Sequence, residues 1–429
     1  MIVSRLVESL VPARLGSGYR WLLASSWTTN LGDGIALAAG PLLVASLTDS
    51  AFLVSLAALL RWAPPLVFGL YAGVVSDTLD RRLVVMAANG ARAVVLTALV
   101  VTMLTGTVSV SMVLVALGLL STAEVFADNT SMTLAPMLVD RDDLAIANSR
   151  LQAGLITLDQ LAGPPIGAAL FAAGMAWPFV TEAVLVSMGV LLVSRMVLPG
   201  HGRRGERDSA SGVWHDIVEG VRWTLHHAAV RTLVLTILIF NVTFGAAWSV
   251  LVLYATRRLG LGAVGFGLLT TVSAVGGLIG VLLYGWITRR VSLGNVMRVG
   301  LVIETLTHLA LAITTSPWVA SAIFFVFGAH AFIWGTTSIT IRQRAVPLHL
   351  QGRVTSVNTI GVYGGLVVGS AIGGILATHY GITAPFWFGF AGSAVFVVLL
   401  WRQLTRIAHA DQQSGTTEEP RAAAGKDAG

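Results

Sequence analysis

Ionisable side chains interrupt several long apolar stretches of this sequence, where they can bind protons or cations. Asp33, Arg61, Glu124 and Asp159 each lie near the middle of such a stretch. A carboxyl group that is withdrawn from water holds a proton more readily, whereas a neighbouring arginine favours the ionised form. A movement of Arg61 toward or away from an acid would therefore release or load a proton. We predict that Asp33 and Glu124 carry protons or other cations and that Arg61 is the switch.

The same residue types also fit purely structural roles. Arg61 and the acids could form a static ion pair that holds the first, second and fourth apolar stretches together. Asp159 stands beside a Gly-Pro sequence and could serve helix packing instead. Three further polar residues lie at a similar depth in their stretches: Asn241, Glu304 and His330. A histidine in such a place is often only hydrogen-bonded.

The composition indicates a membrane protein whose helices position these residues. The chain has 429 residues, of which 55% are hydrophobic and 11% are charged, whereas soluble proteins carry about 25% charged residues. About 20 apolar residues cross a bilayer as a helix, and backbone polar groups in lipid require the helical form. The sequence predicts an all-α membrane fold with twelve transmembrane helices, over Trp21–Leu47, Phe52–Ser76, Leu83–Thr105, Val110–Leu134, Leu144–Ala172, Trp177–Val197, Thr232–Tyr254, Gly262–Ile287, Val296–Thr314, Trp318–Ile341, Val354–Thr378 and Ala384–Leu404.

Arginines gather at one end of the predicted helices. If the twelve helices alternate in direction, the arginine-rich gaps lie on one side, and opposite gaps such as "TDS" and "TGTVSV" lack arginine. Because positive loops face the cytoplasm, we predict that both termini are cytoplasmic. Arg257 and Arg258 fall on the other side and are the exception. The same bias accounts for the formal net charge of +6 without a nucleic-acid partner.

A long polar gap divides the chain into two halves with similar segments. The segment "GPPIGAAL" in the fifth predicted helix resembles "GSAIGGIL" in the eleventh. Parallel repeats of this kind occur in transporters whose substrate site lies between the halves. The predicted organisation is an N-terminal six-helix bundle (1–197), a cytoplasmic linker (198–230), a C-terminal six-helix bundle (231–405) and a disordered cytoplasmic tail (406–429).

The linker contains one amphipathic stretch, in which Val213, Ile217, Val221 and Leu225 share a helical face. Two interpretations are open. The stretch is either an interfacial helix that lies in the headgroup region of the bilayer or an ordinary linker helix.

The turn after the second predicted helix carries a family motif. Its residues are Gly73, Asp77, Arg81 and Arg82. They resemble the loop signature of the major facilitator superfamily, in which a glycine is followed by an aspartate and then by a basic pair. The sequence departs from that signature at Thr78, where a basic residue is common, and at Asp80, where glycine is usual.

This motif suggests a conformational latch. Asp77 could accept hydrogen bonds from Arg92 on the next helix or from an opposing helix end. Such charge-assisted bonds form in one conformation and break in the other. The alternative is that Arg81 and Arg82 only mark the cytoplasmic side of the membrane.

The fifth predicted helix resembles the antiporter motif of the same superfamily. The motif residues are Gly154, Gly163, Pro164 and Gly167, with Asp159 between them. Glycines let helices approach closely, and proline bends or weakens a helix. The resemblance implies export rather than uptake.

The resemblance also implies which residues line the central cavity, because helices 1, 4, 7 and 10 do so in the superfamily. The polar candidates carried over by position are Asp33, Glu124, Asp128, Asn241 and His330. Aromatic residues of helices 7 and 10 either form an apolar wall for a bulky substrate or pack against lipid: Phe244, Trp248, Phe327 and Trp334. Drug–proton antiporters of the superfamily often have an arginine in helix 4, which this sequence lacks, so Arg61 would have to replace it.

The leading prediction is a proton-coupled exporter of amphipathic small molecules in a bacterial cytoplasmic membrane, acting as a monomer by alternating access. A dedicated exporter of a siderophore or metabolite and a lipid transporter remain alternatives, and a non-transporting sensor is a third class. No hydrolase or phosphate-loop motif occurs, so we predict neither an enzyme nor a cofactor or metal site. The absence of cysteine excludes disulfides and thiol chemistry.

Overall fold

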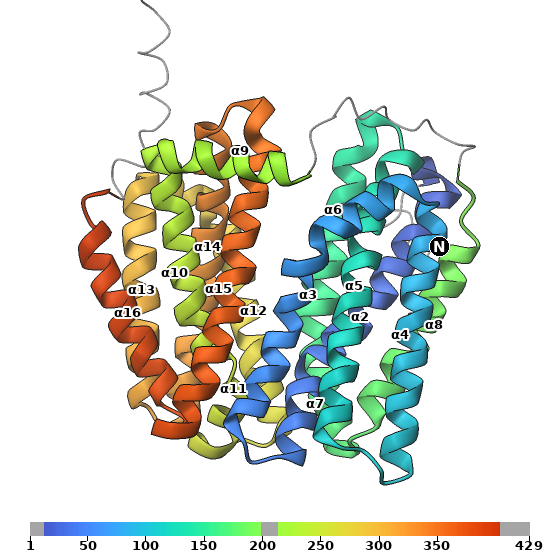
Figure 1. Cartoon of the computed structure of the whole chain (residues 1–429), viewed down its shortest axis with the longest axis horizontal. Coiled ribbons are helices and arrows are strands. Elements are labelled where there is room, and N and C mark those ends of the chain that lie inside the picture. The colour runs from blue at the N-terminus through green and yellow to red at the C-terminus, as the bar shows by residue number, and fades with distance from the viewer. Residues whose placement is uncertain (1–12, 199–212, 404–429) are drawn as a thin grey trace, which may run out of the picture. The chain divides into compact units, whose positions relative to one another are not determined.

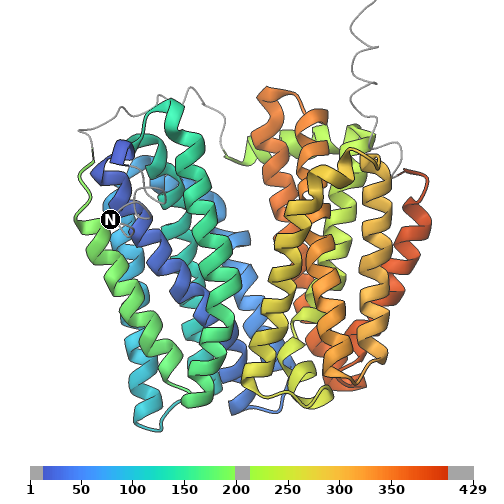
Figure 2. The same ribbon diagram turned by 180° about the vertical axis from the view of Figure 1, so that it is seen from behind.

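The structure is a computed structural model that describes residues 13–198 and 213–403, and all the regular elements in these ranges are helices (Figures 1 and 2). Eleven of the described helices are long and apolar enough to cross a membrane. A shorter apolar helix, α16 (Ala384–Leu400), has 17 residues. Each predicted range overlaps one of these helices, which confirms the all-α membrane fold. The count of twelve spans stays a prediction because α16 is short.

The described residues fall into two compact units. The first comprises residues 13–198, 248–271 and 370–382, and the second comprises residues 213–247, 272–369 and 383–403. The predicted boundaries at 197, 230 and 405 are simpler than these units, because parts of later helices pack with the first unit. The proposed tail, 406–429, lies outside the described residues.

Five long helices build most of the first unit: α2 (Gly16–Leu47), α3 (Ala51–Thr78), α4 (Arg81–Leu104), α5 (Val110–Leu138) and α8 (Trp177–Ser194). Short polar side chains cap their starts, because the first N–H groups of a helix lack partners. Ser50 accepts from Leu53 at the start of α3, and Asp80 accepts from Arg82 at the start of α4. The polar gaps in the sequence are therefore helix caps as well as loops.

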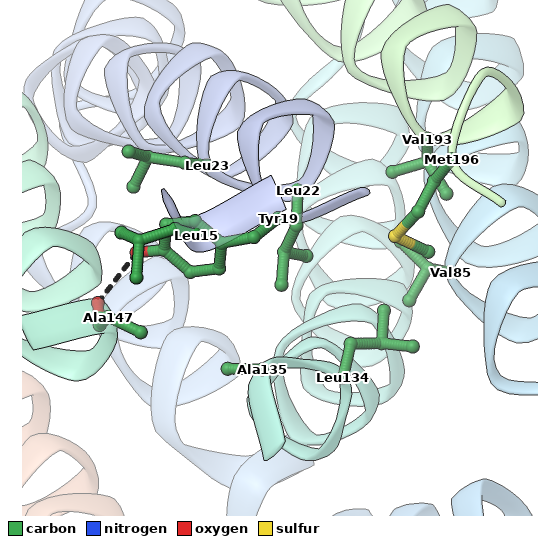
Figure 3. Packing of buried hydrophobic residues seen from close by; sticks show 10 residues of the cluster. All are labelled: Leu15, Tyr19, Leu22, Leu23, Val85, Leu134, Ala135, Ala147, Val193 and Met196. Atoms are coloured by element: carbon green, nitrogen blue, oxygen red, sulfur yellow. Dashed lines mark hydrogen bonds between the residues drawn. The ribbon is translucent and has the colours of Figure 1, made fainter. Parts of the chain in front are cut away.

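An apolar cluster holds the helix ends of this unit together (Figure 3). Tyr19 is fully buried within it, and its hydroxyl donates a hydrogen bond of 2.7 Å to the carbonyl of Ala147. Leu22 and Leu134 pack in the same cluster. This packing joins α2 and α5 to the start of α6 (Leu144–Gly154), so the fifth span is anchored at one end.

The fifth span changes its helical form in its middle. It consists of α6, the π-helix η3 (Leu155–Ala162) and α7 (Gly163–Ala173). The N–H of Gly163 bonds to the carbonyl of Leu158, five residues back. Pro164 and Pro165 follow and have no N–H to offer, which weakens the regular ladder at this point. Such π-turns occur frequently at functional sites.

Glycines bring this span into backbone contact with α2. A Cβ atom added to Gly163 would meet the backbone of Gly34, and one added to Gly167 would meet the backbone of Ile35. At the other end of η3, a Cβ atom on Gly154 would meet the indole of Trp27. Gly163 and Gly167 of the predicted antiporter motif therefore lie where two helices touch without intervening side chains, and Gly154 makes room for the indole of Trp27.

The second unit contains α10 (Ala228–Trp248), α13 (Leu293–Ile313), α14 (Pro317–Ala345) and α16, with most of α12 (Ala263–Thr288) and α15 (Gln351–Tyr380). Its core includes Leu233, Met297 and Ile341, which come from three different helices. The helix α9 (Val213–His226) lies crosswise to α10 and α15 in Figure 1.

Two contacts hold α9 in place within the second unit. Arg353 on α15 forms an ion pair of 2.8 Å with Glu219, and Trp223 stacks on His227 with ring centroids 4.8 Å apart. Val221 and Leu225, two members of the predicted apolar face, are exposed. Burial lowers the pKa of His227, which lies between α9 and α10.

Candidate functional site

A buried ion network connects three helices of the first unit. The guanidinium of Arg92 on α4 donates hydrogen bonds to the carboxylates of Asp33 on α2 and Glu182 on α8, the latter at 3.3 Å. The side chains of Arg92 and Glu182 are each 2% exposed, and that of Asp33 is 7% exposed. Asn89 accepts a further bond from Arg92 at 3.3 Å. Every partner is hidden from solvent, which is typical of a fixed structural network.

A second ion pair lies between α3 and α5 and is more open. Arg61 donates to Glu124 at 2.5 Å, and their side chains are 33% and 16% exposed. The hydroxyl of Ser121 donates to the backbone carbonyl of Arg61 at 3.0 Å. Of the alternative in which Arg61 pairs with acids of the first and fourth stretches, the structure contains the pair with Glu124 but not a pair with Asp33. Asp33 and Arg61 belong to two separate ion pairs, because Arg92 lies beside Asp33.

Two further carboxyl groups in the spans of this unit have no arginine bound to them. Asp159 on η3 is 9% exposed, and its Oδ1 atom accepts no hydrogen bond from the described part of the chain. Asp128, one turn from Glu124 on α5, is exposed and forms no ion pair with any described residue. A charged group on a spanning helix is costly against lipid and usually faces a partner or water.

The balance of charge in these spans is acidic. Between the ends of these spans, five carboxyl groups, at Asp33, Glu124, Asp128, Asp159 and Glu182, stand against the three guanidinium groups of Arg61, Arg92 and Arg150. Three cations cannot neutralise five carboxylates, and unpaired charge in a low-dielectric region is expensive. The excess acids are therefore groups that can take up protons or a cationic ligand.

The second unit contains one acid–histidine pair in its spans. Nε2 of His330 on α14 lies 3.0 Å from a carboxylate oxygen of Glu304 on α13. The ring of Phe327 meets His330 edge-on at 5.9 Å, and Phe244 stacks on Phe327 at 5.8 Å. His330 of the predicted cavity set thus bonds to Glu304 of α13.

The other residues of the predicted cavity and aromatic wall lie in different surroundings. Asn241 donates from its side chain to the carbonyl of Ile237 at 2.7 Å within α10. Trp334 lies against Gly300 of α13, where a Cβ atom would be 2.6 Å from the indole. Trp248 ends α10 and packs in the first unit. The structure therefore brings together Phe244 and Phe327 of the four predicted aromatic residues.

The loop after α3 makes local bonds. Arg81 contacts Asp77 at 3.5 Å and donates to the carbonyl of Ser76 at 3.0 Å. Arg82 donates to the carbonyl of Ser194 on α8. A Cβ atom on Gly73 would meet no atom within 4 Å. The suggested bond between Asp77 and Arg92 is wrong, because Arg92 is buried in the network of Asp33.

The exception to the arginine bias also has a partner. Arg257, in the π-helix η4 (Tyr254–Arg258), pairs with Asp49 between α2 and α3 at 2.6 Å. Both residues belong to the first unit. One of the two arginines on the sparsely charged side thus has a carboxylate partner, and the pair is exposed.

Sequence reasoning missed two members of the buried network. Glu182 was not singled out, although a carboxylate five residues into an apolar range is a signal of the same kind as Asp33. Arg92 was assigned to the loop latch, although it lies eleven residues into α4. In both cases the depth within the span was the available signal.

Comparisons with known proteins agree on the family and the fold. A family model described as "Transmembrane secretion effector" matches residues 8–425. The "Multidrug efflux pump Tap" of Mycolicibacterium fortuitum is 29% identical over 383 residues, which cover 85% of this chain and 90% of that protein. The protein of the same name from Mycobacterium tuberculosis (strain ATCC 25618 / H37Rv) is 28% identical over 364 residues, which cover 83% of this chain and 86% of that protein.

Solved structures show the same fold at lower sequence similarity. The nucleoside transporter NupG aligns with a TM-score of 0.70 at 13% identity and covers 91% of this chain and 99% of its own. A bacterial homologue of the iron transporter ferroportin, in an inward-facing state, aligns with a TM-score of 0.71 at 17% identity. The alignment covers 91% of this chain and 98% of that chain.

Proposed function

The chain belongs to the transmembrane secretion effector family of the major facilitator superfamily, and from that premise we propose that it exports amphipathic small molecules across a bacterial cytoplasmic membrane in exchange for protons. Relatives that match most of its length carry the name multidrug efflux pump. The motifs at Asp77 and at Gly163 and Pro164 point in the same direction, because they resemble a latch and an antiporter motif.

The observation that carries the proton coupling is the open ion pair of Arg61 and Glu124. A pair with partly exposed side chains and one contact between them can exchange partners at a lower cost than a buried network can. Asp128 and Asp159 add acids that no arginine binds. A site of this kind can hold a proton or a cationic substrate on the same carboxyl groups, which is what antiport requires.

The proposed topology places both termini in the cytoplasm, because the arginine-rich gaps follow α3, α5 and α8. Asp77 and Arg81 then lie on the cytoplasmic side, where a short loop can latch one conformation. We propose that a monomer is sufficient, since the acidic groups of the site lie in a single chain.

An exporter of anionic siderophores or metabolites is a weaker candidate. Such a substrate would use Arg61, but Glu124 already occupies that guanidinium at 2.5 Å. The anion would have to displace a carboxylate, whereas a cation would only have to replace a proton or an arginine.

The test uses the purified chain in liposomes with an imposed pH gradient and ethidium as a fluorescent cationic amphiphile. We expect ethidium to move uphill in exchange for protons, and to stop when a protonophore collapses the gradient. Glu124→Gln is the matched variant, because it keeps the size of the side chain but cannot ionise. The proposal fails if wild-type liposomes distribute ethidium as protein-free liposomes do.

A further inference from the structure

Asp159 is a buried acid outside both ion pairs. It lies in the π-helix η3, is 9% exposed, and its Oδ1 accepts no hydrogen bond from the described residues. Asp159 forms no ion pair with a described residue, and a buried carboxylate without a bonded partner is costly, whereas the protonated form is neutral. The surroundings therefore favour a proton on Asp159 in this conformation.

The backbone of η3 packs directly against α2 at Asp159. A Cβ atom added to Gly34 of α2 would meet the backbone of Asp159, and one added to Gly163, directly after η3, would meet the backbone of Gly34. No side-chain layer separates α2 from η3 at this point.

The charged groups that face Asp159 come from three helices. They are Arg61 of α3, Asp33 of α2 and Glu124 of α5. The adjoining α7 has no ionisable residue, and α6 carries Arg150, nine positions away and thus about 13 Å along the helix axis. Asp33 is held by Arg92, so Arg61 is the cation that Asp159 can attract.

Arg61 lies under the influence of two acids that compete for it. Arg61 is bonded to Glu124 and is also attracted by Asp159. A single guanidinium bonded to one acid and attracted by a second is a two-position switch. The protonation of the second acid then decides which position is occupied.

We propose that Asp159 is the proton-binding residue of this chain and that it competes with Glu124 for Arg61. With a proton on Asp159, Arg61 pairs with Glu124, as in the structure. When that proton leaves, the Asp159 carboxylate draws Arg61 away, and Glu124 becomes free to bind the cationic group of a substrate. One proton leaves as one monovalent organic cation binds, so the net charge of the site is unchanged. This inference rests on the proposed exporter function and names its proton site and substrate class.

The first test measures ethidium binding to the purified full chain as a function of pH. Release of one proton per bound cation makes the wild-type dissociation constant fall tenfold for each unit of rising pH across the titration of Asp159. Asp159→Asn imitates the protonated acid, so its dissociation constant should be independent of pH and at least tenfold weaker at high pH. Asp159→Glu, which can still titrate, should keep the slope.

The matched control is Asp142→Asn, the same change on an exposed residue at the start of this span. It should keep the wild-type slope and affinity. A wild-type slope in Asp159→Asn overturns the inference. If wild-type liposomes also fail to move ethidium uphill, the proposed function itself fails, so the two failures are distinguishable.

The second test needs no substrate. A pH-difference infrared spectrum of the wild-type protein should contain the carbonyl stretch of a protonated carboxyl group, and Asp159→Asn should lack that band. In Asp159→Glu the band should shift in frequency, which keeps the test available if the asparagine variant does not fold. An unchanged band in both variants would assign the proton to another acid.

Discussion

Replacement of Arg92 by methionine should destabilise the protein strongly, because it leaves two carboxyl groups buried without their cation. Arg92 makes charge-assisted bonds to Asp33 and Glu182, and each bond of this kind contributes about 1.5–3 kcal/mol. Removing one partner of a buried ion pair costs about 3–5 kcal/mol in measured cases. The two figures agree, so we expect the free energy of unfolding to fall by about 3–5 kcal/mol.

The assay is equilibrium unfolding of the purified protein in mixed micelles, at pH 5 and at pH 8. The loss should be smaller at pH 5, because Asp33 and Glu182 can then take protons and no longer leave unpaired charge. Protons bind more readily to the variant's folded state than to its unfolded state, so its stability declines as the pH rises.

The matched comparison is Arg61→Met. Arg61 is 33% exposed and bonds to one carboxylate, so its loss leaves one acid without its cation rather than two, and the free energy of unfolding should fall by less than in Arg92→Met. Arg92→Lys should lose less stability than Arg92→Met because it retains the charge. Equal effects of Arg61→Met and Arg92→Met would refute the distinction between an open pair and a fixed network.

Three further predictions follow from the loops and glycines. Because the native chain has no cysteine, Thr107→Cys should react with a membrane-impermeant maleimide in intact cells and Asp142→Cys should not; the reverse pattern would invert the topology. Gly34→Ala should cost about 1–3 kcal/mol of stability by overpacking against η3. Gly69→Ala, where a Cβ atom meets nothing within 4 Å, should be neutral or stabilising by up to about 1 kcal/mol. Equal unfolding midpoints for the two variants would contradict the close packing of α2 on η3. Asp77→Asn should slow ethidium export in liposomes while leaving the unfolding midpoint within the error of wild type, and wild-type export would leave Asp77 as an ordinary loop residue.

The spans were predictable because the length and apolarity of a segment decide whether it crosses a membrane. The ion-pair partner of each charged residue was not predictable from the sequence. Asp33, Arg61 and Glu124 share a similar depth, and depth follows directly from position in the sequence. Which neighbour each one meets depends on the rotation of its helix and on the packing order, which a single sequence does not encode locally. Packing therefore decides that Arg92 meets Asp33 and that Arg61 meets Glu124.

Other features depend on contacts that have no local signature. The Gly-Pro sequence predicted a packed or weakened helix, but the π-form of η3 depends on where the N–H of Gly163 finds its carbonyl. The pairing of Arg257 with Asp49 joins residues 208 positions apart. The amphipathic pattern of α9 was visible, whereas its attachment through Glu219 and Arg353 required the folded unit.

Exposure and the number of partners separate two kinds of charged residue within these spans. Arg92 is bonded on several sides in a place without water, so any movement would strand two acids, and its network serves best as a fixed joint of α2, α4 and α8. Arg61 is partly exposed and holds one carboxylate, so it can change partners while remaining paired. Coupling needs a charge that can move between acids at little net cost, because a transporter must pass through both conformations in every cycle. The open pair meets that requirement and the closed network does not, which is why the same chemistry serves stability around Arg92 and exchange around Arg61.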